Sequence, residues 1–298
     1  MASISKFVKA KDVIQAYFST LDKRVYSYKE ISDIFYQNKP NWNLPDKMYA
    51  RDFVEQLEKH LSLTKFEITS VGTQHYTRDH LVKYVFGEIS PFEVALCIRA
   101  KTHLSHFSSM FMLELTEQLP RTIYVTFEQT EKPEKSNSIN QSSIDAAFSK
   151  PQREPSHYYE YLDYKIIMLN SKFTKKAGVI KHNSIYGKNL PIAGLERTII
   201  DITVRPSYSG GVTEVLKAYE RAAKALSINK IIMLLDKLNY VYPYHQSIGF
   251  YMETTNKYRQ TQLSLLNEKD KLFDFYLTYN IAKKAYSKEW RLYYPKNF

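Results

Sequence analysis

Asp163 and Lys165 have the types and the spacing of a metal-dependent nuclease site. In a strand, such a D-x-K pattern places an acidic group that holds Mg²⁺ beside a lysine that assists the attacking water. The pattern is short and therefore unspecific. We keep a Mg-dependent nuclease as an alternative hypothesis for the C-terminal part of the chain.

Glu196, Arg197 and Asp201 form a second cluster of polar residues that invites an active-site interpretation. Arg197 and Asp201 are four residues apart, so they share one face of a helix. The same spacing is typical of a structural ion pair, and the intervening apolar positions suit a buried helix: Ile199, Ile200 and Ile202. We therefore predict that the pair orients this helix in its domain.

His103 and His106 are three residues apart, a spacing that serves one metal ion. No third ligand of a fitting type follows at a recognisable distance. Cys97 is the only cysteine, which excludes an intrachain disulfide and a cysteine-rich zinc module. We predict no metal site.

The sequence lacks the glycine-containing motifs that bind nucleotides. The Gly210-Gly211 pair lacks the G-x-x-x-x-G-K-S/T spacing of a phosphate-binding loop, so we predict a hinge or the start of a helix there. A nucleotidyltransferase needs Gly-Ser followed by paired aspartates, and this arrangement does not occur. We predict no catalytic residues and no cofactor, and expect that the protein is not an enzyme.

The composition favours a polyanionic partner. The 298 residues include 42 Lys and Arg against 31 Asp and Glu, a formal net charge of +11, and the pI is near 9.3. Such a charge attracts DNA or RNA. The excess is diffuse, because residues 1–85 contain thirteen basic and ten acidic side chains. A DNA-binding face in this part must therefore come from the arrangement of its charges.

The length and the apolar content predict two globular domains. Hydrophobic residues make up 44% of the chain and charged residues 24%. The N-terminal sequence lacks the apolar stretch of a signal peptide, and no segment approaches the ~18 apolar residues of a membrane span. We expect a cytoplasmic protein without a membrane association.

Three helices and a hairpin are predicted in the first 86 residues. The first helix shows a helical apolar stripe through Val13, Ile14, Tyr17, Phe18 and Leu21. Ser27 and Glu30 form the capping box of a second helix, and Asp46 is expected to cap a third helix over residues 47–60. Two strands about Gly72 then form a hairpin.

This order is that of a winged helix-turn-helix, in which the third helix enters the major groove and the hairpin touches the DNA backbone. A three-helix packing motif and a protein-binding winged helix remain alternatives. The DNA-binding candidates are the polar residues outside the apolar stripe of the third helix and on the hairpin: Lys47, Tyr49, Arg51, Gln56, Lys59, Lys65, Gln74, His75 and Arg78.

The rest of the chain predicts a larger α/β domain with a helical C-terminal part. Ser90 and Pro91 begin a helix as N-cap and N1 residues. Residues 130–156 are polar and suggest a flexible loop. After it we predict a strand pair or one long strand over residues 158–173, a hairpin-like stretch over 175–194, and helices in the remainder, the last of them over residues 271–287.

Three segments of this part resemble AbiEi-family antitoxins in their residues and order. They are THLSHFSSMFMLELTEQLPRTIYVT (102–126), LERTIIDITVRPSYSGGVTEVLKAY (195–219) and LLDKLNYVYPYHQSIGFYMETT (234–255). With the winged-helix region in front, the resemblance spans residues 11–255. The chain departs from many relatives at Glu114, where they have glycine, and in the long polar segment after the first motif.

The resemblance implies an α+β fold, with a winged helix-turn-helix domain over residues 1–86 and an AbiEi-like α/β antitoxin domain over residues 87–298. It implies an antitoxin and autorepressor of a type IV toxin-antitoxin system that acts in phage defence. The expected partners are operator DNA and an AbiEii-like nucleotidyltransferase toxin, which such an antitoxin counters without a stable complex. The alternatives are a restriction-type nuclease and a winged-helix interaction subunit of a defence complex.

Overall fold

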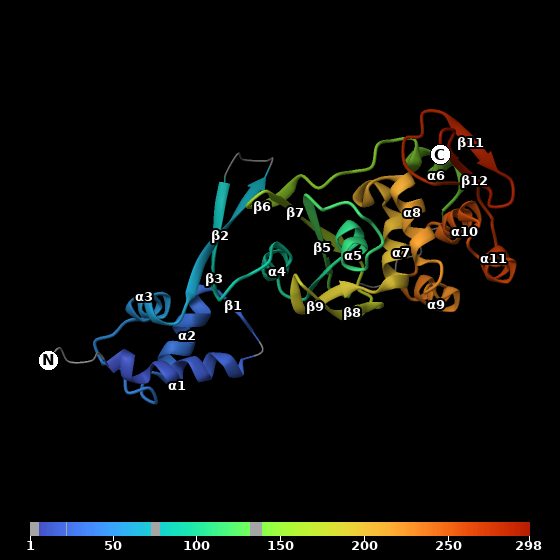
Figure 1. Cartoon of the computed structure of the whole chain (residues 1–298). Helices are drawn as coiled ribbons and strands as arrows, with labels where there is room; N and C mark the ends of the chain where they lie inside the picture. The colour runs from blue at the N-terminus through green and yellow to red at the C-terminus, as the bar shows by residue number, and fades with distance from the viewer. Residues whose placement is uncertain (1–5, 22, 73–77, 132–138) are drawn as a thin grey trace.

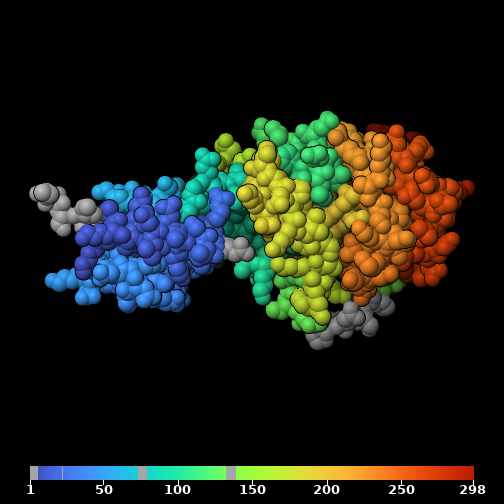
Figure 2. Space-filling model, turned by 60° about the horizontal axis from the view of Figure 1, so that its bottom comes forward, coloured from blue at the N-terminus to red at the C-terminus, as the bar shows by residue number. Residues whose placement is uncertain are grey.

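The computed structural model describes residues 6–21, 23–72, 78–131 and 139–298 of the chain. The elements form a smaller N-terminal lobe and a larger C-terminal lobe (Figure 1). Figure 2 shows the two lobes meeting across a narrower middle region. The mixed α+β fold class expected from the sequence is confirmed. None of the described helices combines the length and the apolar character that crossing a membrane requires.

Three helices and a short strand build the N-terminal lobe: α1 (Lys6–Thr20), β1 (Val25–Tyr26), α2 (Tyr28–Asn38) and α3 (Ala50–His60). Their buried faces share an aromatic core, in which the Phe53 ring stacks on Phe35 at 4.8 Å and on Trp42 at 5.5 Å between centroids. The predicted capping box of α2 is confirmed, because the backbone N–H of Ser27 donates to the Glu30 carboxylate at 2.7 Å.

The predicted apolar stripe of α1 is wrong at its first position. Val13 is 59% exposed. The buried positions begin earlier in the chain: Phe7, Ala10, Ile14 and Phe18. The stripe shifts because the helix starts at Lys6, and the added turn brings Phe7 against Phe53 of α3, with ring centroids 5.9 Å apart.

Helix α3 begins at Ala50 and not at Lys47, and Asp46 does not cap it. The N-cap residue is Tyr49, whose backbone N–H donates to a carboxylate oxygen of Asp52 at 3.0 Å. Asp52 therefore satisfies a backbone donor at the helix end from inside the first turn.

The predicted hairpin about Gly72 is confirmed as β2 (Leu63–Gly72) and β3 (Arg78–Phe86). It is not a free wing, because the last four residues of β2 also pair with the C-terminal lobe. Residues Thr69–Gly72 lie antiparallel to His157–Glu160 of strand β6 (His157–Tyr161). The hairpin thus belongs to one nine-stranded sheet, in the order β1-β3-β2-β6-β7-β5-β4-β9-β8, that runs through both lobes.

The other strands of this sheet are β4 (Thr102–Leu104), β5 (Thr122–Glu128), β7 (Tyr164–Ser171), β8 (Val179–Ser184) and β9 (Gly187–Ala193). Strands β5 and β7 are parallel, as are β4 and β9, and the other neighbours are antiparallel. The predicted strand pair β6–β7 and the hairpin β8–β9 are confirmed. Ile68, Ile123 and Ile166 are fully buried in one core beneath the sheet.

Helices make up most of the remaining C-terminal lobe: α4 (Pro91–Cys97), α5 (His106–Met112), α7 (Leu195–Val204), the short η1 (Pro206–Ser209), α8 (Val212–Ala222), α9 (Ile228–Leu238), α10 (Tyr244–Thr255) and α11 (Gln260–Asn267). Ser90 and Pro91 begin α4 as predicted. Gly210 and Gly211 adopt φ angles of +82° and +89° between η1 and α8, which confirms the predicted helix start.

Two predictions in this lobe are wrong. The polar segment 130–156 contains helix α6 (Gln141–Phe148), whose Ile144 and Phe148 are buried in the core of the C-terminal helices. These two apolar residues are four apart, and they anchor the helix in spite of its polar surroundings. Within the segment, residues 132–138 lie outside the part of the chain that the structure describes.

Residues 271–287, predicted as a helix, contribute strands to a three-stranded sheet at the C-terminus. Its strands are β10 (Phe275–Tyr276), β11 (Lys284–Ser287) and β12 (Leu292–Pro295), in the order β10-β12-β11. The aromatic residues of this segment pack across strands, as Tyr286 does on Tyr293 at 4.8 Å. Such cross-strand aromatic pairs stabilise a sheet.

The small sheet is fixed to α10 by the Trp290 ring, which is 1% exposed and packs directly on Gly249. The indole N–H donates to Glu253 Oε2 at 2.9 Å. A Cβ atom at Gly249 would lie 2.1 Å from the ring, so only glycine leaves room for it.

We expect Gly249→Ala to lower the free energy of unfolding by about 1 to 3 kcal/mol or more, as overpacking of a filled core does. This loss occurs although alanine is intrinsically the better helix former. Gly72→Ala is the matched control, since a Cβ there meets its nearest neighbour at 3.5 Å. Chemical denaturation of the two variants measures the difference, and equal stabilities would contradict the packing role of Gly249.

Candidate nucleic-acid interface and basic pocket

Three of the DNA-binding candidates lie at the start of α3, on the surface of the N-terminal lobe. Lys47 is exposed in the turn before the helix, Tyr49 is 68% exposed, and the exposed Arg51 lies in the first turn. Gln56 is half-buried and Lys59 is exposed farther along the helix. The structure therefore groups the first three residues at the N-terminal end of α3 and spreads the other two along it.

Acidic side chains share the exposed surface of α3 with these candidates. Asp52, Glu55 and Glu58 are exposed beside Arg51 and Lys59. The Arg51 Nε donates to Glu55 Oε1 at 3.2 Å, and both side chains of this pair are exposed. The helix surface therefore has no excess of positive charge, and α3 offers individual donors to a partner instead of a broad attraction to phosphates.

The hairpin residues are separated along a long pair of strands. Lys65 lies near the start of β2 with its Nζ 3.0 Å from Glu67 Oε1, and this carboxylate raises the pKa of Lys65. Arg78 begins β3 opposite Val71, at the end of the hairpin that joins β6. Two further candidates lie outside the described residues: Gln74 and His75. Among the described hairpin candidates, Lys65 therefore lies on the half of the hairpin nearer to α3.

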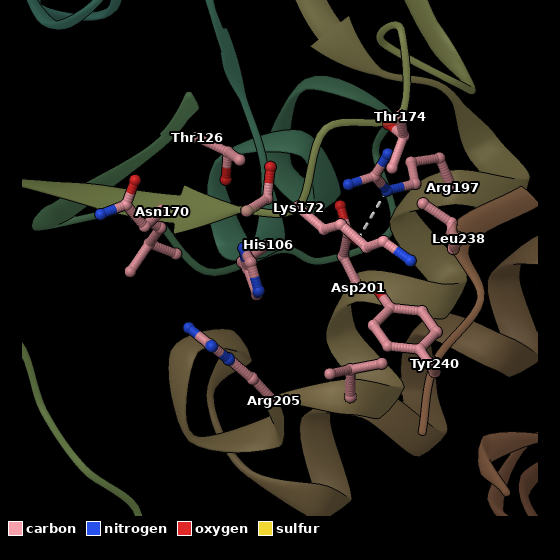
Figure 3. Close-up of a pocket in the computed structure, with 13 residues that line it drawn as sticks. His106, Thr126, Asn170, Lys172, Thr174, Arg197, Asp201, Arg205, Leu238 and Tyr240 are labelled. Atoms are coloured by element: carbon pink, nitrogen blue, oxygen red, sulfur yellow. Dashed lines mark hydrogen bonds and ion pairs between the residues drawn. The ribbon is translucent and has the colours of Figure 1, made fainter. Parts of the chain in front are cut away.

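A pocket of about 160 Å³ lies in the C-terminal lobe at the carboxyl end of β7. Its walls come from α5, β5, α7 and the segments that follow β7 and α9 (Figure 3). The charged and hydrogen-bonding side chains that line it include His106, Lys172, Arg197, Asp201, Arg205 and Tyr240. Figure 3 shows Arg205 extending toward the side where His106 lies, with Arg197 and Asp201 on the other side.

The Arg197–Asp201 ion pair forms one wall of this pocket, and its predicted structural role fits its burial. The Arg197 Nε donates to Asp201 Oδ1 at 2.7 Å, and the Arg197 Nη1 donates to the Ala177 carbonyl at 2.8 Å. The two side chains are only 3% and 5% exposed. Burial raises the pKa of the Asp201 carboxyl, against the opposing effect of Arg197. The second oxygen, Asp201 Oδ2, is buried without a hydrogen-bond partner in the described part of the chain.

His106 lines the pocket from the first position of α5. Its Nδ1 lies 3.0 Å from Ser105 Oγ, and its ring packs edge-on against Tyr208 at 5.7 Å between centroids. Burial and the nearby Arg205 hold the pKa of His106 well below its usual range. The imidazole is therefore neutral at pH 7 and presents one donor and one acceptor.

His103 does not join His106 at a metal site in the described residues. It lies in β4, fully buried, and burial lowers the pKa of its imidazole to about 3. No group of three or more His, Cys, Asp or Glu side chains with the geometry of a metal site occurs within the described part of the chain.

The nuclease candidates Asp163 and Lys165 lie at the surface, in and after the turn between β6 and β7. Both are exposed, and the Lys165 Nζ lies over the Tyr158 ring at 4.4 Å from its centroid. Neither residue lines the basic pocket. Lys165 instead lies opposite Glu160 of β6, away from the charged groups of the pocket.

Sequence reasoning missed Lys172, Arg205 and Tyr240 as neighbours in one pocket. They follow three different elements, namely β7, α7 and α9, and only the fold brings them together. One signal was present in the sequence: Arg197, Asp201 and Arg205 follow each other at intervals of four residues. That spacing predicts one face of a helix, and the structure keeps Arg197 and Asp201 on α7 while Arg205 follows its last residue.

We expect Arg197→Ala to destabilise the protein by about 3 to 5 kcal/mol, because it leaves the Asp201 carboxylate buried without its partner. Arg51→Ala is the matched control, since it breaks a pair of the same spacing at 84% and 58% exposure. Removal of that exposed pair costs only about 0.3 to 0.5 kcal/mol. Denaturant unfolding at pH 7 compares the two, and a loss below 1 kcal/mol for Arg197→Ala would argue against a structural role.

No known protein family and no curated protein matches this sequence. Among solved structures, the crystal structure of the RV2827C protein from Mycobacterium tuberculosis is similar to it, with a TM-score of 0.56 and 12% sequence identity. The similarity covers 96% of this chain and 91% of that chain. It extends over both lobes, and at this identity it shows a shared fold alone.

Proposed function

We propose that this protein is an antitoxin of the AbiEi type, which binds its own operator DNA and counters a nucleotidyltransferase toxin. The observation that carries the DNA-binding part is the order α1, α2, α3 and hairpin, with Lys47, Tyr49 and Arg51 exposed at the start of α3. Recognition helices contact base edges through their N-terminal residues. The net charge of +11 supports a polyanionic partner.

The local geometry suits selective contacts at the start of α3. Asp52 is engaged with the backbone N–H of Tyr49, and Glu55 holds Arg51 through its Nε. A guanidinium oriented by a neighbouring carboxylate is suited to bidentate contact with a guanine edge. Glu58 lies farther along the helix, where approach of the phosphate backbone would be disfavoured. The DNA is therefore expected to meet the N-terminal end of α3.

We expect the protein to prefer the DNA upstream of its own gene over random duplex, with an affinity that falls as salt rises. Arg51→Ala should weaken specific binding by about 1 to 3 kcal/mol and relax the sequence preference, as loss of a bidentate base contact does. Lys65→Ala should weaken the binding of both DNAs alike. It should also reduce the slope of log affinity against log salt concentration by about one unit, the loss of one phosphate contact. Fluorescence anisotropy titrations at several salt concentrations measure all three effects.

The control for these titrations is Arg121→Ala, which removes an exposed arginine from the C-terminal lobe. It should bind both DNAs as the wild type does. An absence of preference for the upstream DNA in the wild type, or wild-type binding by Arg51→Ala, would reject α3 as an operator reader.

The antitoxin part of the proposal rests on the three AbiEi-like segments, which fall in α5–β5, in α7–α8 and in α9–α10. We expect expression of this chain from an unrelated promoter to restore the growth of cells that produce a nucleotidyltransferase toxin encoded beside it. Arg51→Ala should restore growth equally, because toxin antagonism belongs to the C-terminal lobe in this hypothesis. Growth arrest in the presence of the wild-type chain would contradict the antitoxin role.

A protein-binding winged helix is the second candidate. It is favoured by the acidic side chains Asp52, Glu55 and Glu58 on the exposed surface of α3, which repel phosphates and suit a basic protein surface. The pairing of β2 with β6 also occupies part of the hairpin that a free wing would offer to DNA. The anisotropy titrations separate the two functions.

A further inference from the structure

The basic pocket of the C-terminal lobe has a position suited to a ligand. It lies at the carboxyl end of β7 and beside β5, the two parallel strands in the centre of the nine-stranded sheet. In α/β sheets, ligands bind outside the carboxyl ends of parallel strands. Helix α7 covers the opposite side and contributes Arg197, Asp201 and the following Arg205 (Figure 3).

The charges of the pocket select an anion. Lys172, Arg197 and Arg205 are cationic, and Asp201 is the one carboxylate among the described lining residues, so the lining itself carries two net positive charges. The Glu128 carboxylate lies just behind the lining, where it accepts from the Thr174 hydroxyl and acts on Arg197. His106 adds no charge at pH 7, because burial lowers the pKa of its ring. Three cations around a cavity raise the local concentration of an anionic ligand.

The pocket is built from buried polar groups and is not a chance cluster of surface lysines. Arg197 is 3% exposed and held on two sides by Asp201 and by the Ala177 carbonyl. Asp201 is 4% exposed, and its Oδ2 has no hydrogen-bond partner among the residues that the structure describes. A buried acceptor of this kind calls for a donor from a bound water or ligand. A ligand that suits both the cationic side chains and the unpaired Asp201 oxygen carries negative charge and also a proton on oxygen.

Neutral donors complete the lining. Burial raises the pKa of the Tyr240 phenol, which therefore stays protonated at the edge of the pocket. On the β5 side, Thr126 Oγ1 shares a hydrogen bond of 2.7 Å with Ser105 Oγ. The Thr174 hydroxyl donates to Glu128, so its proton is already engaged. The Tyr240 and Thr126 hydroxyls and the cationic side chains together match the several oxygens of a tetrahedral oxyanion.

The size of the cavity limits the ligand to one small group. Its volume of about 160 Å³ lies below the roughly 300 to 1,000 Å³ of pockets that enclose drug-sized ligands. A cavity of about 150 Å³ holds a guest the size of benzene. A phosphate group fits this volume, with any larger part of the molecule outside.

We propose that this pocket binds a phosphate group, as inorganic phosphate or as the terminal phosphate of a nucleotide, between Arg197, Lys172 and Arg205. Inorganic phosphate at neutral pH keeps a proton that can be donated to Asp201 Oδ2. The terminal phosphate of a nucleotide, with a second pKa of about 6, keeps this proton in a minor fraction. Sulfate has no such proton. The site lies in the C-terminal lobe and is independent of the winged helix. Phosphate binding and operator binding can therefore be tested, and rejected, separately.

The test is isothermal titration calorimetry of the full chain with inorganic phosphate, ATP and sulfate, at an ionic strength held constant with chloride. Phosphate and ATP should bind, and sulfate should bind more weakly. Arg205→Ala and Lys172→Ala should each weaken the affinity for phosphate by about tenfold or more, as loss of one charge-assisted contact does. Tighter binding of ATP than of phosphate, with the same loss in Arg205→Ala, would identify a nucleotide as the source of the group.

The matched controls are Arg121→Ala and Lys188→Ala, which remove exposed basic side chains that do not line the pocket. Both should bind phosphate as the wild type does. Far-ultraviolet circular dichroism and thermal melts without ligand verify that every variant is folded. The proposal is overturned if 10 mM phosphate and ATP give no heat beyond that of chloride, if sulfate binds as tightly as phosphate, or if both pocket variants bind like the wild type.

Discussion

The backbone ladder between β2 and β6 is the interaction on which the arrangement of the whole molecule depends. Strand β2 begins with Leu63 in the aromatic core of the N-terminal lobe and continues through Phe66 and Ile68 into the core beneath the large sheet. Its last residues then pair with β6. One strand therefore supplies side chains to two cores and hydrogen bonds to both lobes. A partner bound by α3 is positioned relative to the C-terminal lobe through this strand.

Helix α7 has a similar dual role within the C-terminal lobe. Its Ile199, Ile200 and Ile202 are fully buried among the C-terminal helices, while Arg197 and Asp201 turn toward the pocket. The ion pair thus holds the helix and shapes a cationic wall with the same atoms. The ion pair can therefore stabilise the helix while the residues around it bind a ligand.

Local patterns predicted the parts of the fold that depend on local physics. The capping box at Ser27, the N-cap role of Ser90, the hairpin about Gly72 and the buried stripe of α7 follow from local patterns. Two of the failures involve tertiary contacts: the short α6 is held by Ile144 and Phe148 in a distant core, and residues 271–287 form strands because aromatic side chains meet across β11 and β12. The pocket escaped prediction for the same reason, since its cations come from separate elements.

The shared hairpin has a consequence for any attempt to divide the chain. A cut after Phe86 would leave β2 in the N-terminal fragment with an unpaired edge where β6 had been, and would leave β6 as an uncovered edge in the C-terminal fragment. The second fragment would also lack Phe66, Ile68 and Val85 from its core. Unprotected edges of this kind recruit strands from other molecules. Each half, isolated at that point, would carry a self-complementary surface that the intact chain conceals.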